Sequence, residues 1–396
     1  MSALSQRNRI LYPLLVVVGV VAGCCAEARA AEDDYQAYCL YRAGFDYPSG
    51  NPPYDQDVQG IGHDQDNWFI TQTEDLWKIP VHYALGSVED DDPGVLRNSI
   101  EAYPEIYDPG YRHFGDPVTF SYENRTFLLV PIENDQAGLP GAVAAFRTYD
   151  LAYISHAILP PQVFDAGWCA VDDAGFLYSS RQRASSVFRY SVDWDRLVND
   201  DELAITMLDE IPIYDESGTN LLDLGTMQGG EFAPGSKLLY LLSGYHDDDD
   251  QEMVSEGIHV MDTTTWRRVA HSTNGYGYFN YDYSTVWDGE PEGLTVWDLD
   301  DGRAPNISGQ LHVFMLDNEA FDDVELYHYT NVWRVDRNSP CSPGEPSCPF
   351  RTVAAAHGVI FPRSEMRIQA GAYPENLLLT KPMRMTATGG VARIGN

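Results

Sequence analysis

The amino-acid sequence predicts an all-β protein, a β-propeller of five blades followed by a short C-terminal appendage. Short runs rich in Val, Ile, Tyr, Phe and Trp recur between turn residues, a pattern typical of β-strands. No long stretch of the body shows the apolar periodicity of an amphipathic helix. Between residues 59 and 330 the runs fall into five groups, and their period of roughly 50 residues is typical of propeller blades.

Residues 1–30 are expected to be a signal peptide. Arg7 and Arg9 precede an apolar run, which small residues follow. A membrane-spanning helix needs about 20 uninterrupted apolar residues, so a retained anchor is disfavoured. Two processing routes stay open. Cleavage before Ala31 would secrete the protein, whereas the sequence before Cys24 resembles a lipobox and would leave a lipid anchor at the cell surface.

The five groups are expected to form the propeller within residues 31–337. Each group opens on a Gly-containing strand and continues as strand, turn, strand. The groups begin at Gly60, His113, Ala166, Met227 and Glu290. The fifth group is one strand short, and residues 35–45 lie outside any group, so a strand from the N-terminal side is expected to close the ring. A six-bladed ring and a pair of β-sandwich sheets are the alternatives.

The net charge narrows the classes of ligand. Acidic residues outnumber basic ones by 60 to 25, which gives a formal charge of -35. Attraction to nucleic acid or to an anionic lipid surface is therefore disfavoured. Cations, neutral small molecules and extracellular glycans remain as ligand classes.

Four cysteines follow the signal segment. If the protein is exported, they can form disulfides. Cys341 and Cys348 bracket a short Pro/Gly/Ser loop and are expected to pair, which would close the linker 338–348. A bridge between Cys39 and Cys169 follows only by elimination. A zinc site is disfavoured because the sequence has no Cys-x-x-Cys pair beyond the signal segment.

The sequence pattern of residues 349–396 differs from that of the five groups. The stretches PFRTVAAA, RIQAGAYPENLLL and TATGGVARIG resemble the opening coils of a pectin-lyase-like parallel β-helix. The resemblance implies a β-helix-like appendage with a short capping helix followed by single rungs of a solenoid. A solenoid needs several rungs to bury its faces. This segment must therefore pack on the propeller or be the remnant of a longer architecture.

The innermost strands of a propeller converge on a central channel, so polar residues on these strands are the candidate site. Carboxylate and amide oxygens are the ligands that Ca²⁺ prefers, and this makes Asp116, Glu231 and Glu292 candidate calcium ligands. The central-channel candidates are His63, Asp64, His113, Asp116, Glu231, Glu290 and Glu292, with Gln59 and Gln228 beside them.

Glu292 lies in the motif PEGLTV, which resembles the first inner-strand motif of gluconolactonase-type and paraoxonase-type propellers. The resemblance implies a metal-binding role for Glu292, although the Asn and Asp ligands that those families use on other blades find no match here. The Asp-Pro at Asp116 and the Glu-Gly-Leu at Glu292 partly resemble motifs of five-bladed glycosidases. Asp116 with Glu231 or Glu292 would then supply an acid pair about 5 to 10 Å apart.

An aromatic cluster precedes the fifth group and consists of Tyr276, Tyr278, Tyr281, Tyr283 and Trp287. If exposed, these rings would form a platform for the apolar faces of a sugar. The alternative is that they belong to the ordinary core of a strand.

The favoured function is that of an exported binding or scaffold protein at the cell exterior, with a glycan, a small molecule or calcium as its ligand. The alternatives are a metal-dependent hydrolase of lactonase or phosphoesterase type, and a glycosidase-like propeller that uses central-channel carboxylates. The fold alone does not separate these functions, because propellers serve all of them.

Overall fold

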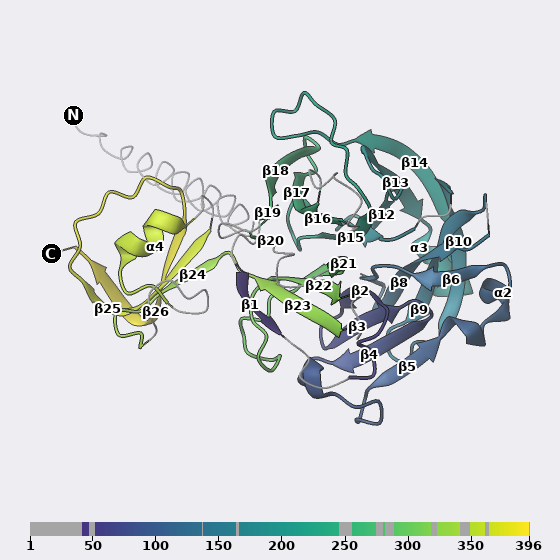
Figure 1. Ribbon diagram of the computed structural model, residues 1–396, viewed down its shortest axis with the longest axis horizontal. Helices are drawn as coiled ribbons and strands as arrows, with labels where there is room; N and C mark the ends of the chain where they lie inside the picture. The colour runs from purple at the N-terminus through teal and green to yellow at the C-terminus, as the bar shows by residue number, and fades with distance from the viewer. Residues whose placement is uncertain are drawn as a thin grey trace, which may run out of the picture.

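Five antiparallel sheets surround a central axis as blades, and a smaller parallel sheet lies beside them (Figure 1). The prediction of an all-β, five-bladed propeller is confirmed, and the six-bladed ring and the sandwich pair are wrong. The computed structural model describes residues 42–46, 52–136, 138–163, 166–244, 256–274, 280–281, 289–317, 323–340, 349–360 and 364–395.

Blades 1 to 3 follow one another along the chain, each with its strands in order from the axis outward. Blade 1 contains β2 (Val58–His63), β3 (Asn67–Gln72), β4 (Asp75–Pro80) and β5 (Leu96–Ser99). Blade 2 contains β6 (Tyr111–Phe114), β7 (Val118–Tyr122), β8 (Arg125–Asn134), β9 (Pro140–Arg147) and β10 (Tyr153–Val163). Blade 3 contains β11 (Ala170–Val171), β12 (Phe176–Ser179), β13 (Ser186–Val192) and β14 (Ile205–Pro212). In blade 2 both β6 and β7 pair with β8, so the innermost position is shared by two short strands.

Blades 4 and 5 complete the ring. Blade 4 contains β15 (Met227–Phe232), β16 (Leu238–Ser243), β17 (Gly257–Asp262) and β18 (Arg267–His271). Blade 5 contains β21 (Gly289–Val296), β22 (Leu311–Asp317), β23 (Asp323–Tyr329) and, outermost, β1 (Arg42–Asp46). Because β1 pairs antiparallel with β23, a strand from the N-terminal side closes the ring, as the short fifth group predicts.

The connections carry only short helices. They are η2 (Leu85–Ser87), η3 (Ile100–Ala102), α2 (Pro104–Tyr107) and α3 (Trp194–Asp200). The side chain of Asp193 accepts the backbone N–H of Arg196 and so caps α3. Two further short strands, β19 (Thr273–Asn274) and β20 (Asn280–Tyr281), pair in parallel. No helix in the described part of the chain is long and apolar enough to cross a membrane.

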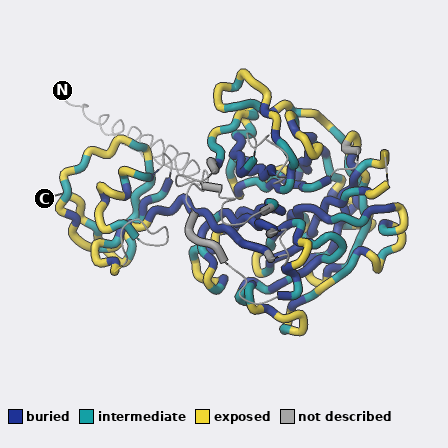
Figure 2. Tube along the Cα trace, in the orientation of Figure 1, coloured by how far each residue is buried: buried dark blue, intermediate teal, exposed yellow. Residues whose placement is uncertain are grey.

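The core of the propeller consists of hydrophobic clusters that each lie between two neighbouring blades. Successive residues of a strand point to opposite faces of the sheet. In β3, for example, Trp68 and Ile70 pack towards blade 5, whereas Phe69 packs towards blade 2. Both faces of a blade are therefore buried, which explains why its inner strands read as nearly continuous apolar runs. Figure 2 shows these buried strands throughout the ring.

The appendage is a three-stranded parallel sheet. Its strands are β24 (Val332–Val335), β25 (Glu365–Tyr373) and β26 (Arg384–Ile394). The helix α4 (Val353–Val359) precedes β25 and packs on the sheet through Val353 and Ala356. The first strand of this sheet, β24, lies within residues 31–337, the range that the sequence analysis assigns to the propeller. A small parallel sheet with one short helix is the arrangement that the β-helix resemblance predicts.

Asp300, in the connection between β21 and β22, joins the appendage to the propeller. Its carboxylate oxygens lie 3.2 Å from an Arg334 guanidinium nitrogen and 3.4 Å from one of Arg367. The Asp300 side chain is only 6% exposed, and its oxygens also accept hydrogen bonds from Gly309 and Gln310. The appendage therefore packs on the propeller, which is one of the two arrangements that its small number of rungs allows.

The cysteines are placed only in part. Cys169 is a fully buried free thiol between blades 2 and 3, and its Sγ lies 3.7 Å from the Leu129 carbonyl oxygen. Cys169 is therefore unpaired among the described residues, which gives the Cys39–Cys169 bridge no support. Cys39 itself lies outside the described residues, and so do the predicted signal peptide 1–30 with Cys24, and the predicted pair Cys341 and Cys348.

Candidate functional site

Each blade places one glycine at the same level of the axis. A Cβ added at Gly60 would lie 2.5 Å from the Cα of Asp116, and one at Gly167 would lie 2.6 Å from the carbonyl oxygen of Met227. We call this set the glycine collar; it comprises Gly60, Gly115, Gly167, Gly229 and Gly293. Only residues without a side chain let neighbouring backbones approach so closely. The backbones therefore fill the axis at this level and divide the channel into two mouths.

Asp116 lies within the collar and contacts every other blade. Its Oδ1 accepts the backbone N–H of Ile61 at 3.0 Å, and its Oδ2 accepts those of Gly230 at 3.1 Å and Leu294 at 3.3 Å. Its own N–H donates to the Gly167 carbonyl oxygen at 2.8 Å. Burial raises the pKa of Asp116 well above its usual value, although the three N–H groups act in the opposite direction.

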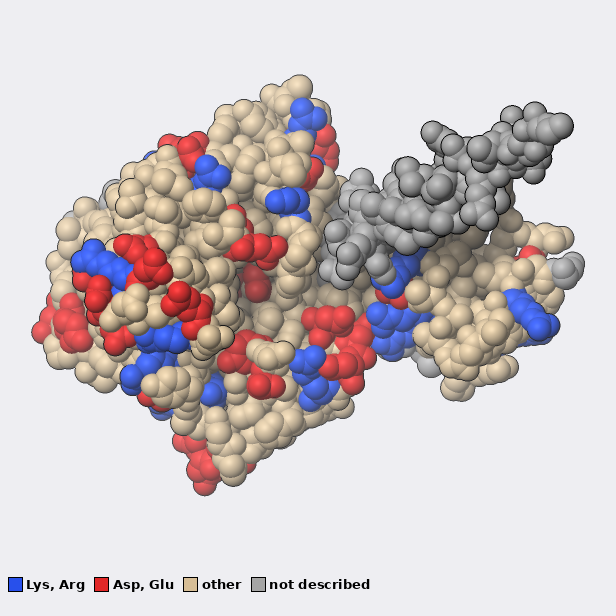
Figure 3. Space-filling model, turned by 180° about the vertical axis from the view of Figure 1, so that it is seen from behind, with Lys and Arg blue, Asp and Glu red and all other residues tan. Residues whose placement is uncertain are grey.

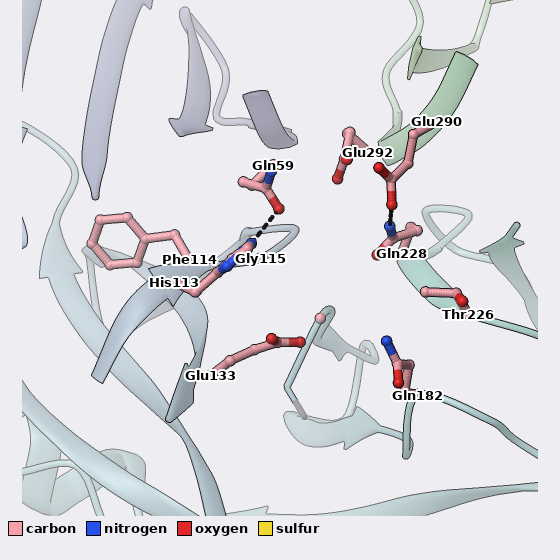
Figure 4. Close-up of a pocket in the computed structure, with 11 residues that line it drawn as sticks. Gln59, His113, Phe114, Gly115, Glu133, Gln182, Thr226, Gln228, Glu290 and Glu292 are labelled. Carbon is pink, nitrogen blue, oxygen red and sulfur yellow. Dashed lines mark hydrogen bonds between the residues drawn. The ribbon is translucent and has the colours of Figure 1, made fainter. Parts of the chain in front are cut away.

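A cavity of about 280 Å³ opens at one mouth of the channel, and residues of all five blades and their connections line it. Its lining is formed by Gln59, His113, Phe114, Gly115, Glu133, Gly167, Gln182, Thr226, Gln228, Glu290 and Glu292. Glu290 and Glu292 come from the start of β21, whereas Glu133 lies at the end of β8 and points into the cavity from the opposite side (Figure 4). The cavity thus has carboxyl groups on two opposing walls.

Glu292 has a carboxyl group whose pKa is strongly shifted. Its side chain is almost completely buried, with the residue 2% exposed. Burial raises the pKa of Glu292 well above the usual value, and the carboxylates of Glu290, Glu133 and Asp116 raise it further. Glu290 is held beside it by Gln228, whose amide nitrogen donates to Glu290 Oε1 at 2.7 Å (Figure 4). Glu292 therefore keeps its proton to a higher pH than an ordinary carboxyl group.

The remaining polar groups of the cavity are neutral hydrogen-bonding groups. Burial lowers the pKa of His113, which keeps its imidazole uncharged near neutral pH. One ring nitrogen of His113 lies 2.5 Å from the side-chain oxygen of Gln59. Among the described residues, no Lys or Arg lines the cavity. Figure 3, which shows the molecule from behind, has acidic side chains around a hollow near the middle of the ring.

The second mouth of the channel holds other predicted residues. Glu231 Oε2 accepts hydrogen bonds from the Thr295 hydroxyl and the Val296 N–H, both at 2.7 Å. Burial raises the pKa of Glu231. His63 stacks on Trp297 with ring centroids 4.5 Å apart, and its Nε2 lies 3.8 Å from Glu231 Oε1. These residues lie beyond the collar from the cavity.

Asp64 has a local role at the same end of blade 1. Its Oδ1 accepts the backbone N–H groups of Asp66 and Asn67, each at 2.8 Å, and the Asn67 side-chain amide at 2.9 Å. Such bonds from an Asp side chain to the following backbone are typical of turns. Asp64 therefore closes the turn between β2 and β3.

The predicted calcium ligands are not gathered around one point. The oxygens of Asp116 face three backbone N–H groups, Glu231 is bonded at the second mouth, and Glu292 lines the cavity. Within the described ranges, no group of three His, Cys, Asp or Glu side chains is arranged to hold a metal ion. Calcium binding stays a prediction.

The predicted aromatic platform falls largely outside the described residues. This applies to Tyr276, Tyr278, Tyr283 and Trp287, and of Tyr281 only the backbone in β20 is described. Its role in ligand binding therefore stays a prediction.

Three lining residues with polar side chains are absent from the set predicted from sequence, namely Glu133, Gln182 and Thr226. Glu133 is the last residue but one of β8, which lies second from the axis in its blade, and Gln182 and Thr226 lie in connections. One signal for Glu133 was present. It is an acidic residue at the end of an otherwise apolar run, FLLVPI, and the polar end of a buried strand points to a mouth of the channel.

No protein-family model matches the chain, and no curated protein matches it in sequence. Solved structures are similar at low identity. The GH43_1 enzyme from Xanthomonas citri complexed with xylose is 12% identical, with 75% of this chain and 92% of that chain covered and a TM-score of 0.44. A thermostable family-43 glycoside hydrolase is 11% identical, with coverages of 69% and 88% and a TM-score of 0.40. A luciferin-regenerating enzyme is 9% identical, with coverages of 72% and 95% and a TM-score of 0.36. At these values the blade count rests on the strand pairing, and no activity is transferred.

Proposed function

We propose that this protein hydrolyses glycosidic bonds of neutral carbohydrates and binds one sugar ring in the cavity. The observation that carries the proposal is Glu292. It is a buried carboxyl group with a raised pKa, it lines a cavity, and a second carboxyl group, Glu133, faces it from the opposite wall. Two carboxyl groups in different states of protonation on either side of the scissile bond are what glycoside hydrolysis requires.

The role of Glu292 follows from its buried environment, and Glu133 takes the complementary role from the opposite wall. Glu292, which keeps its proton, would give it to the glycosidic oxygen as the bond from that oxygen to the anomeric carbon breaks. Glu133 would act on the other face of the sugar, either by taking a proton from the attacking water or by attacking the anomeric carbon itself. In both cases one water is consumed, and the free sugar and the alcohol of the leaving group are the products.

The lining of the cavity favours an uncharged, hydroxyl-rich ligand. The amides of Gln59, Gln182 and Gln228 both donate and accept hydrogen bonds, as sugar hydroxyl groups do. An anionic sugar would face the carboxyl groups with no described Lys or Arg in the lining to offset its charge. A volume of about 280 Å³ lies just below the usual range for ligand pockets, about 300 to 1,000 Å³, so it suits a single ring.

The test is a panel of 4-nitrophenyl glycosides of neutral pentoses and hexoses, in both anomers, compared with a glucuronide and a sugar phosphate. Release of nitrophenol from at least one neutral glycoside and none from the anionic ones is the expected result. Calorimetry with the free sugars separates binding from hydrolysis. Binding without hydrolysis would support the binding or scaffold protein that the sequence favours, and no binding by any neutral sugar would refute the proposal.

A chelator arm of the same panel addresses the metal-dependent alternative. Because the proposed chemistry uses only Glu292 and Glu133, hydrolysis is expected to continue in excess EDTA. Activity that is lost in EDTA and restored by calcium would instead support a metal-dependent hydrolase.

A further inference from the structure

Three side chains that line the cavity share one relation to Asp116. Each of the backbone N–H groups that donate to its carboxyl group lies two residues after a lining side chain. The pairs are Gln59 with Ile61, Gln228 with Gly230, and Glu292 with Leu294. In each inner strand the pairing shifts register at the lining residue, which therefore lies in a β-bulge, and the N–H bound by Asp116 fixes the backbone just after that bulge. The position of each N–H therefore sets the position of the side chain before it.

We infer that Asp116 is a positioning residue, which holds the inner strands of blades 1, 4 and 5 in the register that brings Gln59, Gln228 and Glu292 to one cavity. Asp116 itself is not among the residues that line the cavity. The inference rests on the proposed function for its meaning in catalysis, but the contacts themselves are independent of any ligand.

The geometry leaves no obvious substitute for this carboxyl group. Its two oxygens serve three donors from three blades, and Asp116 is 1% exposed, so water does not replace them. The glycine collar leaves room for it, because a Cβ at Gly229 would lie 3.0 Å from Asp116 Oδ2 and one at Gly293 would overlap Oδ1. An Asn at this position has a single acceptor oxygen, and its NH₂ group would face at least one N–H.

The inference is distinguished from a merely structural role by a double-mutant cycle. The proteins are the wild type, Asp116→Asn, Glu292→Gln and the double variant, each measured for affinity towards the best neutral sugar, for kcat and KM, and for melting temperature. Misplacing a reacting group by about 1 Å costs up to about 100-fold in rate. Asp116→Asn is expected to weaken sugar binding at least about ten-fold in both backgrounds, because Gln59 and Gln228 are displaced too. It should also lower kcat, and by clearly less when Glu292 is already Gln.

Two further variants serve as controls. Tyr54→Phe removes a buried hydrogen bond to the Leu85 carbonyl oxygen, 2.9 Å long, and neither residue lines the cavity. It should lower the melting temperature and leave sugar affinity unchanged. Thr71→Val is a milder test if Asp116→Asn does not fold, because the Thr71 hydroxyl donates to the Gly115 carbonyl oxygen at 3.0 Å and so holds the residue before Asp116. It should weaken sugar binding in the same direction but by less.

The outcomes separate the two proposals. Wild-type affinity in Asp116→Asn, or in Thr71→Val where the former does not fold, would overturn the positioning role, and so would independent effects of Asp116→Asn and Glu292→Gln on kcat. If the wild type binds no neutral sugar, the proposed function fails, and the cycle is then read from melting temperatures alone. Non-additive shifts in the absence of ligand would still support the positioning of Glu292 by Asp116, whereas additive shifts would refute it.

Discussion

The backbone N–H of Leu294 donates to Asp116 Oδ2 at 3.3 Å and joins blade 5 to blade 2 across the axis. These blades are not neighbours in the ring, so the bond is possible only where the glycine collar brings the inner backbones together. Asp116 and Glu292 are also coupled electrostatically, because the carboxylate of Asp116 is one of the groups that raise the pKa of Glu292. The site is therefore a property of the whole ring and not of one blade.

Glu292→Gln is expected to abolish most hydrolysis while sparing the binding of substrate. The amide has nearly the same shape as the protonated acid but cannot transfer a proton. General acid catalysis contributes about 10² to 10⁴ in rate, so kcat should fall within that range and the affinity for the free sugar should change little. Gln228→Glu serves as a contrasting variant, since it removes the donor to Glu290 and adds negative charge. A Glu292→Gln enzyme with unchanged kcat would exclude Glu292 as the acid.

The stability of Glu292→Gln relative to the wild type should increase as the pH rises above 4.5, the ordinary pKa of a Glu side chain. The pKa of Glu292 is raised in the folded protein, so the folded state binds a proton that the unfolded state releases above its ordinary pKa. Each additional unit of pH between the two pKa values therefore costs the wild type up to about 1.4 kcal/mol of unfolding free energy, and the variant avoids this cost.

Melting curves of both proteins at matched pH values check this prediction. The comparison with the variant is needed because burial lowers the pKa of His312 to about 4 and also lowers that of His328. These two residues give a slope of the opposite sign, with stability lost as the pH falls below about 6.5. A constant difference between the two curves would contradict a raised pKa for Glu292.

Gly115→Ala should destabilise the propeller strongly. The new Cβ would overlap the Gly167 carbonyl oxygen, and the other atoms that it would meet are also backbone atoms of Ala166 and Gly167, so no flexible side chain can move aside. Overpacking of this kind costs about 1 to 3 kcal/mol or more. Gly358→Ala is the matched control, because that glycine lies in α4 with no atom within 4 Å of its added Cβ. Chemical denaturation of both variants gives the comparison, and equal stabilities would refute the close approach of the blades.

Asp300→Asn should loosen the appendage without opening the ring. The change removes the charge that two guanidinium groups share, at a side chain that is 6% exposed. Because Arg334 is half exposed, the loss is expected to be about 1 to 2 kcal/mol rather than that of a fully buried pair. Limited proteolysis should then release the appendage faster than in the wild type. Asp223→Asn, which breaks a pair with Arg183 whose side chains are 60% and 63% exposed, should cleave like the wild type.

The ring was predictable because each blade repeats the same physical requirement. A blade must bury both faces and begin with a glycine at the axis, and both features are visible in sequence as apolar runs after Gly60 or Gly293. The outer strand of blade 5 was predictable for the same reason. The fifth group supplies only three strands, so the fourth strand of that blade must come from elsewhere in the chain.

The site was predictable only where it uses the innermost strands. His113, Glu290 and Glu292 could be assigned to the channel by their place in the repeat, and they line the cavity. Glu133 could not, because it lies on a second strand and reaches the axis only through the length of β8. The sequence also does not tell on which side of the glycine collar a residue lies. Glu231 and Glu292 both lie on innermost strands, but Glu231 lies at the second mouth and Glu292 lines the cavity.

The pairing of Arg42 in β1 with Tyr329 in β23 has a consequence in time. During synthesis the first strand of the ring leaves the ribosome long before its partner exists. At about 5 to 20 residues per second, the wait is on the order of tens of seconds. Loop-closure entropy grows slowly with loop length, so joining two strands this far apart in the sequence adds little free energy of closure. Until the two ends meet, however, the outer edge of β23 stays unpaired. We expect this seam to be the last part of the ring to form and the first to separate when the chain is pulled from its N-terminal side.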